Sequence, residues 1–510
     1  MIDDDGDVTD GAEIHDECGV FGIIRPGKAA VTLDTYYALY ALQHRGQQAC
    51  GMVISDDGVF TNHRDTGLVG DVFTRPVLEA LGEGEMATGH VRYGTSGGGG
   101  RINAQPLVLN HVKGPMALAH NGNLVNAHRL RRELEAQGSI FHTTIDSEVI
   151  GYVITKERLT SGSIDEAVER AMPKLNGAYS LVLMTPTKIV AVRDPRGMRP
   201  LCYGSLPDGG YAVASETVGL DAVGATYVRD VEPGEIVTFA RTGTGASPIT
   251  VHSNRRWVDS APHSLCVFEY TYFARPDSII DGAPVHDARQ RAGAFLAHGD
   301  DVEADIVIGV PDSGLEAAQG YAKASGLPLE KGFVKNKYIG RTFISPDKDD
   351  RKRGVQIKLN PVPSVVRGKR IVLIDDSIVR GTTAGRIINL LRTAGATAVH
   401  FRVSAPPFIN PCHYGTDIDS RENLIACHYT QEEIRTSIGA DSLGYLTVEQ
   451  VKRIADDSAV TGFCTACFSG DYPTELPEPG PLDRFRVKIS EANNKADATR
   501  SHADIKEATL

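Results

Sequence analysis

The chain has 510 residues, of which 65 are acidic and 53 are basic, and its formal net charge is −12. This length predicts roughly two to four domains, each able to bury its own core. The acidic balance argues against a nucleic-acid partner, and no run approaches the roughly 20 apolar residues that span a bilayer. We therefore expect a globular protein of the cytoplasm with no membrane partner.

The first 17 residues form an acidic leader without Lys, Arg or an apolar run, which excludes a secretory signal. Such a leader is either a disordered terminus or a pro-segment. We favour a pro-segment that is removed, because the pattern changes at Cys18. In a reducing cytosol, the eight cysteines are expected to be catalytic, metal-binding or core residues rather than disulfides.

Apolar runs beyond Cys18 predict strands over 19–24, 51–54, 87–91, 116–119, 178–184 and 188–192. Helical spacing is found over 33–44, 124–134 and 147–159. Many strands with few helices between them are typical of stacked sheets with helices outside. The sequence therefore favours a layered α+β first half rather than a βαβ repeat.

A stretch of small and polar residues over 241–264 predicts a domain boundary near 255–265. Beyond it, expected strands at 304–310, 370–374 and 398–404 alternate with expected helices at 315–324 and 382–394. This alternation predicts a parallel sheet with crossover helices. The expected domains are 18–258 and 259–472, followed by a charged tail over 473–510.

The most specific local signal is the strand 371–374 followed by Asp375, Asp376 and a short polar loop. A helix N-terminus presents free N–H groups to a phosphate, and the loop adds hydroxyls and a glycine that permits close approach. These phosphate-binding candidates are Ser377, Gly381, Thr382 and Thr383. The two carboxylates suit ribose hydroxyls or hydrated Mg²⁺. The competing interpretation is a helix cap beside a solvated acidic turn.

Two further segments fit a phosphorylated substrate. The turn after the strand at 307–310 contains Asp312 and Ser313, whose backbone N–H groups are placed to hold pyrophosphate, although an ordinary turn explains the pattern equally well. Residues 331–358, with Lys335 among them, carry a net charge of +6 (nine basic minus three acidic residues). A basic run is usually a solvated loop, but here we favour a lid over a polyanion.

Cys18 is the candidate nucleophile of the first half. If the leader were cleaved, Cys18 would carry a free α-amine with a pKa of about 7.7–8.0, which can serve as the base for its own thiol. Arg92 can hold the α-carboxylate of an amino acid amide, and Asp146 its α-ammonium. Asn121 and the N–H of Gly122 can form an oxyanion hole. Taken singly, these residues also fit a surface ion pair, a helix cap and a hairpin turn.

The remaining cysteines offer a candidate metal site. Cys464 and Cys467 form a C-x-x-C motif, and Cys266 and Cys412 would complete a set of four thiolates. Four thiolates fit either Zn²⁺ or an iron–sulfur cluster, and sequence spacing does not choose between them. The pair Cys427-His428 is a rival ligand set. Cys50 and Cys202 are expected in the core.

These motifs carry a family resemblance. The pattern over 18–240 resembles a class II glutamine amidotransferase domain, an N-terminal-nucleophile hydrolase with an αββα sandwich. The loop at 371–383 resembles the ribose-phosphate loop of type I phosphoribosyltransferases, which have a parallel sheet. Their order over about 18–473 is similar to the glutamine phosphoribosylpyrophosphate amidotransferase family. The resemblance therefore implies an α/β (α+β) chain with both folds.

The resemblance implies a pentosyltransferase of purine synthesis. Glutamine would give glutamate and ammonia, and channelled ammonia would convert phosphoribosyl pyrophosphate (PRPP) into 5-phosphoribosylamine and pyrophosphate. Arg45 and Gly46 would support the glutamine pocket, and Tyr272 would lie between the sites. Asp312, Ser313, Lys335 and the loop from Asp375 to Thr383 would bind PRPP, with Mg²⁺ at Ser313, Asp375 and Asp376.

For the four cysteines, the resemblance implies a [4Fe–4S] cluster. It also implies a homotetramer and feedback inhibition by purine nucleotides. Two other hypotheses remain. One is a class II glutamine amidotransferase with a different acceptor, against which the ribose-phosphate loop argues. The other is a non-catalytic sensor of PRPP or nucleotides, against which the residue set around Cys18 argues.

Overall fold

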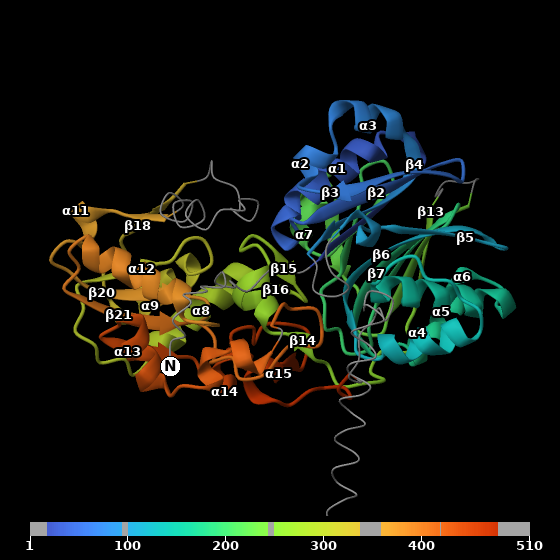
Figure 1. Cartoon of the computed structure of the whole chain (residues 1–510). Coiled ribbons are helices and arrows are strands. Elements are labelled where there is room, and N and C mark those ends of the chain that lie inside the picture. The colour runs from blue at the N-terminus through green and yellow to red at the C-terminus, as the bar shows by residue number, and fades with distance from the viewer. Residues whose placement is uncertain (1–17, 94–99, 243–248, 337–358, 419, 478–510) are drawn as a thin grey trace, which may run out of the picture.

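The computed structural model describes residues 18–93, 100–242, 249–336, 359–418 and 420–477. The expected leader, most of the expected basic lid and most of the expected tail lie outside the described residues. Figure 1 shows two halves side by side, with stacked sheets in the first and a sheet flanked by helices in the second. In the described part of the chain, no helix is both long and apolar enough to cross a bilayer.

The first half contains two antiparallel sheets. One has the strand order β11-β9-β10-β1-β4-β2-β3. Its strands are β1 (Gly19–Ala29), β2 (Ala49–Asp56), β3 (Val59–Thr66), β4 (Gly84–Arg92), β9 (Cys202–Ser205), β10 (Tyr211–Ala214) and β11 (Thr226–Asp230). The other has the order β13-β12-β8-β7-β6-β5. It contains β5 (Leu107–His111), β6 (Gly114–Leu124), β7 (Gly177–Met184), β8 (Lys188–Arg193), β12 (Ile236–Arg241) and β13 (Ile249–Asn254).

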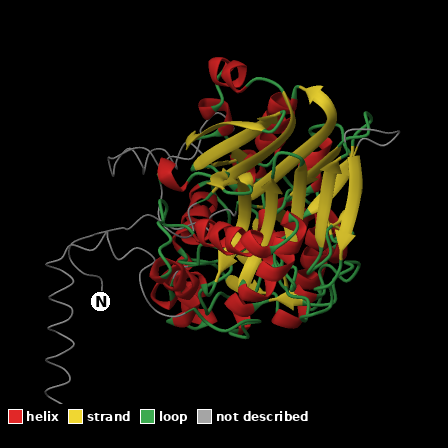
Figure 2. Cartoon of the chain, turned by 90° about the vertical axis from the view of Figure 1, so that its right-hand side faces the viewer, coloured by secondary structure: helices red, strands yellow, loops and turns green. Residues whose placement is uncertain are grey.

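These sheets stack through an apolar core and are covered by helices outside (Figure 2). Val20 and Val53 of the first sheet pack with Val182 and Phe239 of the second. The outer face of the first sheet is covered by α1 (Val31–Ala41), α2 (Val69–Val72), α3 (Arg75–Leu81) and α7 (Thr217–Asp221). The second is covered by α4 (Ala127–Ala136), α5 (Asp146–Thr160) and α6 (Ile164–Ala171). The expected αββα sandwich is confirmed.

The second half is built on a parallel sheet of order β17-β20-β21-β22. Its strands are β17 (Ile306–Gly309), β20 (Arg370–Asp375), β21 (Ala398–Val403) and β22 (Ser442–Tyr445). One face packs on α8 (Val285–Ala297) and α9 (Leu315–Ser325), and the other on α12 (Thr382–Thr393) and α13 (Gln431–Ile438). The expected parallel sheet with crossover helices is confirmed.

Short elements complete this half. They are β14 (Leu265–Cys266), the π-helical turn Glu269–Phe273, β15 (Ile279–Ile280), β16 (Ala283–Pro284), β18 (Phe333–Lys335), β19 (Leu359–Pro361), α11 (Pro363–Val366), α14 (Val448–Lys452), β23 (Phe463–Cys464) and α15 (Ala466–Ser469). Because β17 and β20 are parallel neighbours, the loops that follow them meet at one edge of the sheet.

Candidate active sites

Cys18 lies immediately before β1, an interior strand of the first sheet that pairs with both β10 and β4. The first residue of β1, Gly19, pairs with Val91 of β4. The Cys18 thiol donates a hydrogen bond to the carbonyl oxygen of Tyr93, with an Sγ–O distance of 3.6 Å. Arg45 Nε donates to the Cys18 carbonyl at 3.2 Å. One contact therefore holds the thiol of Cys18 and the other holds its backbone, both near the end of β4.

Arg92 is the final residue of β4 and only 3% of it is exposed, so it is not a surface ion pair. Burial lowers the pKa of its guanidinium, while the nearby Cys18 and Asp146 oppose that shift. Asp146 is the first residue of α5, and its carboxylate accepts a hydrogen bond from the backbone N–H of Leu124 at 2.8 Å. A buried cation and a buried carboxylate thus lie near the candidate nucleophile.

The candidate oxyanion hole lies within β6 rather than in a hairpin turn. Asn121 is buried, and its Nδ2 has no hydrogen-bond partner among the described residues. Gly122 has φ +130°, and a Cβ at this position would lie 2.2 Å from the carbonyl oxygen of Ala178. Only glycine fits there, so the Gly122 N–H keeps its direction. A buried amide donor without a partner is typical of a site that binds an oxygen atom.

Gly46 has a steric role beside this site. A Cβ at Gly46 would lie 2.6 Å from the backbone nitrogen of Arg92. The missing side chain lets the 3-10 turn Gln43–Arg45 pack directly on the end of β4. That contact brings the Arg45 guanidinium to the Cys18 carbonyl. Both residues expected to support the glutamine pocket are therefore close to the nucleophile.

The second candidate site is a cavity of about 690 Å³ at the carboxyl edge of the parallel sheet. Every residue expected to bind PRPP lines it, namely Asp312, Ser313, Lys335, Asp375, Asp376, Ser377, Gly381, Thr382 and Thr383. The hydroxyl of Ser313 donates to the carboxylate of Asp376, and Lys335 Nζ forms an ion pair with Asp312 at 2.5 Å. The three expected segments are therefore brought together around one space.

The phosphate loop ends at the N-terminus of α12. Gly381 is the cap residue of that helix and has φ +82°, a conformation that favours glycine. Thr382 and Thr383 are the first helical residues, so their N–H groups face the cavity end of the helix. Asp375 and Asp376 are each less than one-tenth exposed, at 8% and 7%. The loop therefore has the arrangement of an anion site beside two carboxylates.

Several lining residues were not expected from the sequence. His44 and Gln47 come from the first half, so this cavity is walled by both halves of the chain. Arg289 of α8 is buried and donates to the carbonyl oxygens of Tyr270, Tyr272 and Ala274 at 2.8, 2.8 and 2.7 Å. No local sequence pattern marks these residues, because their roles depend on partners far along the chain.

The four candidate ligand cysteines meet in one place. Cys266 and Cys464 are register partners in the parallel pair β14–β23. With Cys412 and Cys467 they line a cavity of about 20 Å³ whose wall also includes apolar residues such as Phe268 and Phe408. None of the eight cysteines, which all lie in the described ranges, forms a disulfide. Cys427, the rival candidate, instead donates to the carbonyl oxygen of Ile409 at 3.2 Å.

Burial raises the pKa of Cys464 to about 12, and it raises that of Cys467 well above its usual value. Over the described ranges, no three His, Cys, Asp or Glu side chains are gathered tightly enough to hold a single metal ion. The four thiols therefore share the wall of one cavity without converging on one point. This arrangement differs from a closed zinc site, whose four ligands surround one ion.

The sequence matches two family profiles. A glutamine amidotransferase domain matches residues 99–222, and a phosphoribosyl transferase domain matches residues 288–415. The chain is 48% identical to the amidophosphoribosyltransferase of Bacillus subtilis, covering 93% of this chain and 98% of that protein. It is 45% identical to the amidophosphoribosyltransferase of Methanocaldococcus jannaschii, covering 90% and 98%.

Two solved structures are also similar to this chain over most of its length. The glutamine PRPP amidotransferase of B. subtilis in complex with ADP and GMP is 46% identical, with a TM-score of 0.80, and covers 92% of this chain and 99% of that one. A structure described as the allosteric regulatory enzyme of purine biosynthesis gives a TM-score of 0.82 at 46% identity and the same coverage. With both catalytic folds present and near-complete coverage, this chain belongs to the amidophosphoribosyltransferase family, the glutamine-dependent pentosyltransferases of the first step of purine biosynthesis.

Proposed function

We propose that Cys18 is the nucleophile of the glutamine half-reaction and that the cavity at Asp375–Thr383 is the PRPP site. The observation that carries this proposal is the position of Cys18 beside buried Arg92 and Asp146, with the unpartnered amide of Asn121 on the adjacent sheet. The glutamine half is assigned to residues 18–258 and the phosphoribosyl half to 259–472. Residues 1–17 are a pro-segment, whose removal frees the Cys18 α-amine.

In the first step, the Cys18 α-amine takes the thiol proton and the sulfur attacks the amide carbon of glutamine. Asn121 Nδ2 and the Gly122 N–H stabilise the oxyanion that forms. The C–N bond then breaks, and ammonia leaves with the proton. Water hydrolyses the thioester to glutamate and restores the thiol. Arg92 and Asp146 hold the α-carboxylate and α-ammonium of the substrate, which fixes the amide against the sulfur.

In the second step, ammonia attacks C1 of PRPP while the bond from C1 to the pyrophosphate oxygen breaks. The α12 N-terminus and the hydroxyls of Thr382 and Thr383 hold the 5′-phosphate, and Asp375 and Asp376 hold the ribose hydroxyls. Asp312, Ser313 and Lys335 bind the pyrophosphate. Tyr272, at the wall shared by both halves, lies on the route of ammonia. A route without water keeps ammonia from becoming ammonium, which is not nucleophilic.

We propose two cofactors, Mg²⁺ and an iron–sulfur cluster. Mg²⁺ would be held by Asp375, Asp376 and Ser313, whose oxygen atoms are the ligands that this ion prefers, and would neutralise charge on the pyrophosphate. A [4Fe–4S] cluster would be held by Cys266, Cys412, Cys464 and Cys467. Such a cluster would join chain segments that are distant in sequence.

We also propose a cytoplasmic homotetramer inhibited by purine nucleotides. The B. subtilis relative was solved with ADP and GMP, which supports nucleotide binding by this chain. Sedimentation of the purified protein tests the assembly. Adding AMP, ADP or GMP to the activity assay tests the inhibition.

An isotope experiment tests the whole reaction. Glutamine labelled with ¹⁵N in its amide is supplied with PRPP and Mg²⁺, and the products are analysed by mass spectrometry. We expect the label in 5-phosphoribosylamine or its hydrolysis products, with pyrophosphate released in equal amount. Label that appears only in free ammonia, without pyrophosphate, would favour a glutaminase with another acceptor. No label release at all would favour a non-catalytic sensor.

A further inference from the structure

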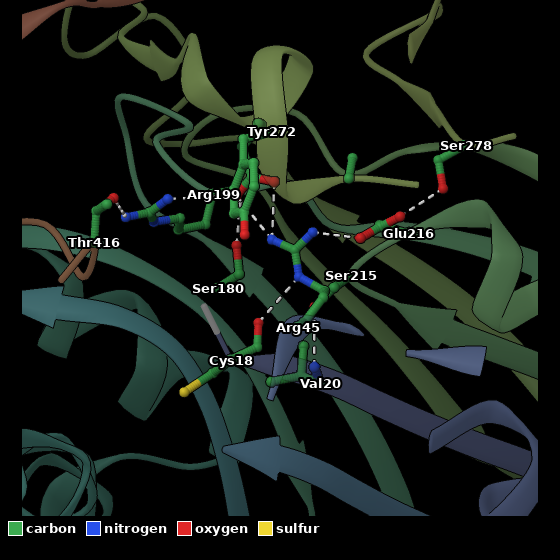
Figure 3. Close-up of polar contacts among 12 residues, drawn as sticks. Cys18, Val20, Arg45, Ser180, Arg199, Ser215, Glu216, Tyr272, Ser278 and Thr416 are labelled. Atoms are coloured by element: carbon green, nitrogen blue, oxygen red, sulfur yellow. Dashed lines mark hydrogen bonds and ion pairs between the residues drawn. The ribbon is translucent and has the colours of Figure 1, made fainter. Parts of the chain in front are cut away.

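A buried ionic network connects the Cys18 backbone to the wall of the phosphoribosyl cavity (Figure 3). Arg45 is at its centre and is only 1% exposed. Its Nε contacts the Cys18 carbonyl, one terminal nitrogen donates to Glu216, and the other donates to both carboxylate oxygens of Glu269 at 2.8 and 2.9 Å. Glu216 belongs to the first half and Glu269 to the π-helical turn of the second.

Glu216 links elements of both halves through one carboxylate. It immediately precedes α7 and is fully buried. Its Oε1 accepts hydrogen bonds from His44 Nε2, at 2.8 Å, and from Arg45. Its Oε2 accepts from the backbone N–H of Arg275 at 3.0 Å and from the Ser278 hydroxyl at 2.6 Å. These four bonds match the number of lone-pair sites that a carboxylate offers.

The partners of Glu216 reach both candidate sites, and His44 on the Oε1 side also lines the phosphoribosyl cavity. On the Oε1 side, Arg45 contacts the backbone of Cys18. On the Oε2 side, Arg275 is part of the segment 272–276 that lines the phosphoribosyl cavity. Burial alone would raise the pKa of Glu216, but His44, Arg45 and the hydrogen bonds hold it well below its usual value. The carboxylate therefore stays ionised, and its four partners are all donors.

We propose that Glu216 is a positioning residue that keeps Cys18 in register with the cavity wall at Arg275, so that ammonia is released where it is consumed. This inference rests on the proposed role of Cys18. A rigid ionic link suits this task because a misplacement of about 1 Å between groups that must act together can cost about 10²-fold in rate. Loss of the link would uncouple the two half-reactions rather than abolish either.

Two variants weaken the link, one at its cavity side and one at Glu216 itself. Ser278→Ala removes one donor on the cavity side and leaves Arg45 and His44 in contact with Glu216. Glu216→Gln keeps the shape of the side chain but places an amide donor against other donors on one side. Ser55→Ala is the control, because Ser55 is buried in the first half and its hydroxyl has no hydrogen-bond partner among the described residues.

The measurement is the ratio of pyrophosphate to glutamate released at saturating glutamine and PRPP, which is one for a coupled enzyme. We expect Ser278→Ala to lower this ratio by about twofold or more and to leave KM for glutamine nearly unchanged. Glu216→Gln is expected to lower it further. The double variant should be no worse than Glu216→Gln, because both changes break the same link. Ser55→Ala should keep the ratio at one.

A ratio of one in Ser278→Ala and Glu216→Gln, with only a lower Tm, would assign Glu216 a purely structural role and overturn the inference. Cys18→Ala separates this failure from failure of the underlying function. If Cys18→Ala loses glutamine hydrolysis while both link variants stay coupled, the inference about Glu216 alone is wrong. If Cys18→Ala still hydrolyses glutamine, the proposed nucleophile itself is wrong, and the inference falls with it.

Discussion

Arg193 and Asp281 form a bidentate ion pair, with nitrogen–oxygen distances of 2.6 and 2.8 Å, where the two halves of the chain meet. Arg193 is the last residue of β8, and Asp281 lies in the turn between β15 and β16. A second carboxylate, the half-buried Asp230, accepts a hydrogen bond from the Tyr227 hydroxyl at 2.6 Å. Burial, and then repulsion by Asp281, raises the pKa of Asp230 well above its usual value.

This cluster predicts a pH dependence of stability. Because the folded pKa of Asp230 is raised, the native state keeps a proton that the unfolded state has lost. Stability from this group therefore falls as pH rises from the ordinary carboxyl range through the raised pKa. In Asp230→Asn, Tm should fall less than in the parent protein between about pH 5 and about pH 8. Equal slopes of Tm against pH in both proteins would contradict this.

Asn121→Ala is expected to impair only the glutamine reaction. Removing one oxyanion donor costs about 10²- to 10³-fold in rate. The glutamine-dependent rate should therefore fall by that factor, while ammonium-dependent release of pyrophosphate from PRPP is retained. A steady-state assay with each nitrogen source checks this. Equal losses with both sources would mean that Asn121 supports the fold rather than the oxyanion.

Asp376→Asn should weaken the use of PRPP. A hydrogen bond to a charged group contributes about 1.5–3 kcal/mol, so kcat/KM for PRPP should fall by about 10- to 150-fold. Asp305→Asn is a matched control, since Asp305 precedes β17 at the opposite end of the sheet and pairs with Arg370 at 3.0 Å. The control should keep the parent kcat/KM. An unchanged value in Asp376→Asn would remove this carboxylate from the PRPP site.

Cys464→Ser tests the thiol set. If the four thiols hold an iron–sulfur cluster, the purified variant should lose iron, sulfide and visible absorbance, and its Tm should fall. Cys427→Ser is the control, because Cys427 packs against the same core as Cys266, Cys412 and Cys467 but does not line the cysteine cavity. Iron content that is the same in both variants, or zinc in place of iron in the parent protein, would refute the cluster.

Local sequence patterns were sufficient to predict the helices and strands whose boundaries are sharp. The strand expected at 370–374 is β20, and the helix expected at 382–394 is α12, which ends one residue earlier at Thr393. In both cases an apolar run meets a polar loop with glycine, so the transition is encoded locally. The position of the polar loop between β20 and α12 was predictable for the same reason.

The helix predicted over 33–44 is present as α1, but the large apolar residues that predicted it lie mostly on its exposed face. Leu33, Tyr37 and Tyr40 are 45%, 56% and 60% exposed. The buried face is formed by Val31, Thr32, Thr35, Ala38 and Leu39, which include two polar threonines. A pattern of large apolar residues therefore points to the wrong face when the sheet beneath requires small side chains. Gly89 of β4, which packs against Thr35, shows this close contact.

No local sequence pattern predicted the ionic network around Arg45. Arg45 meets Glu216 and Glu269 across separations of 171 and 224 residues. A single charged residue in a sequence is usually solvated, so no local pattern indicates burial. Only the folded chain shows which charges are paired. The same holds for His44, whose place in the wall of the phosphoribosyl cavity depends on the contact between the halves.

Cys18→Ala provides the most direct test of the central claim that the Cys18 sulfur releases ammonia for use at the PRPP cavity. Pyrophosphate release from PRPP is measured with glutamine and then with ammonium chloride at alkaline pH. We expect no detectable glutamine-dependent release and an ammonium-dependent rate close to that of the parent enzyme. Glutamine-dependent release that persists in Cys18→Ala would show that a group other than the Cys18 sulfur releases the ammonia.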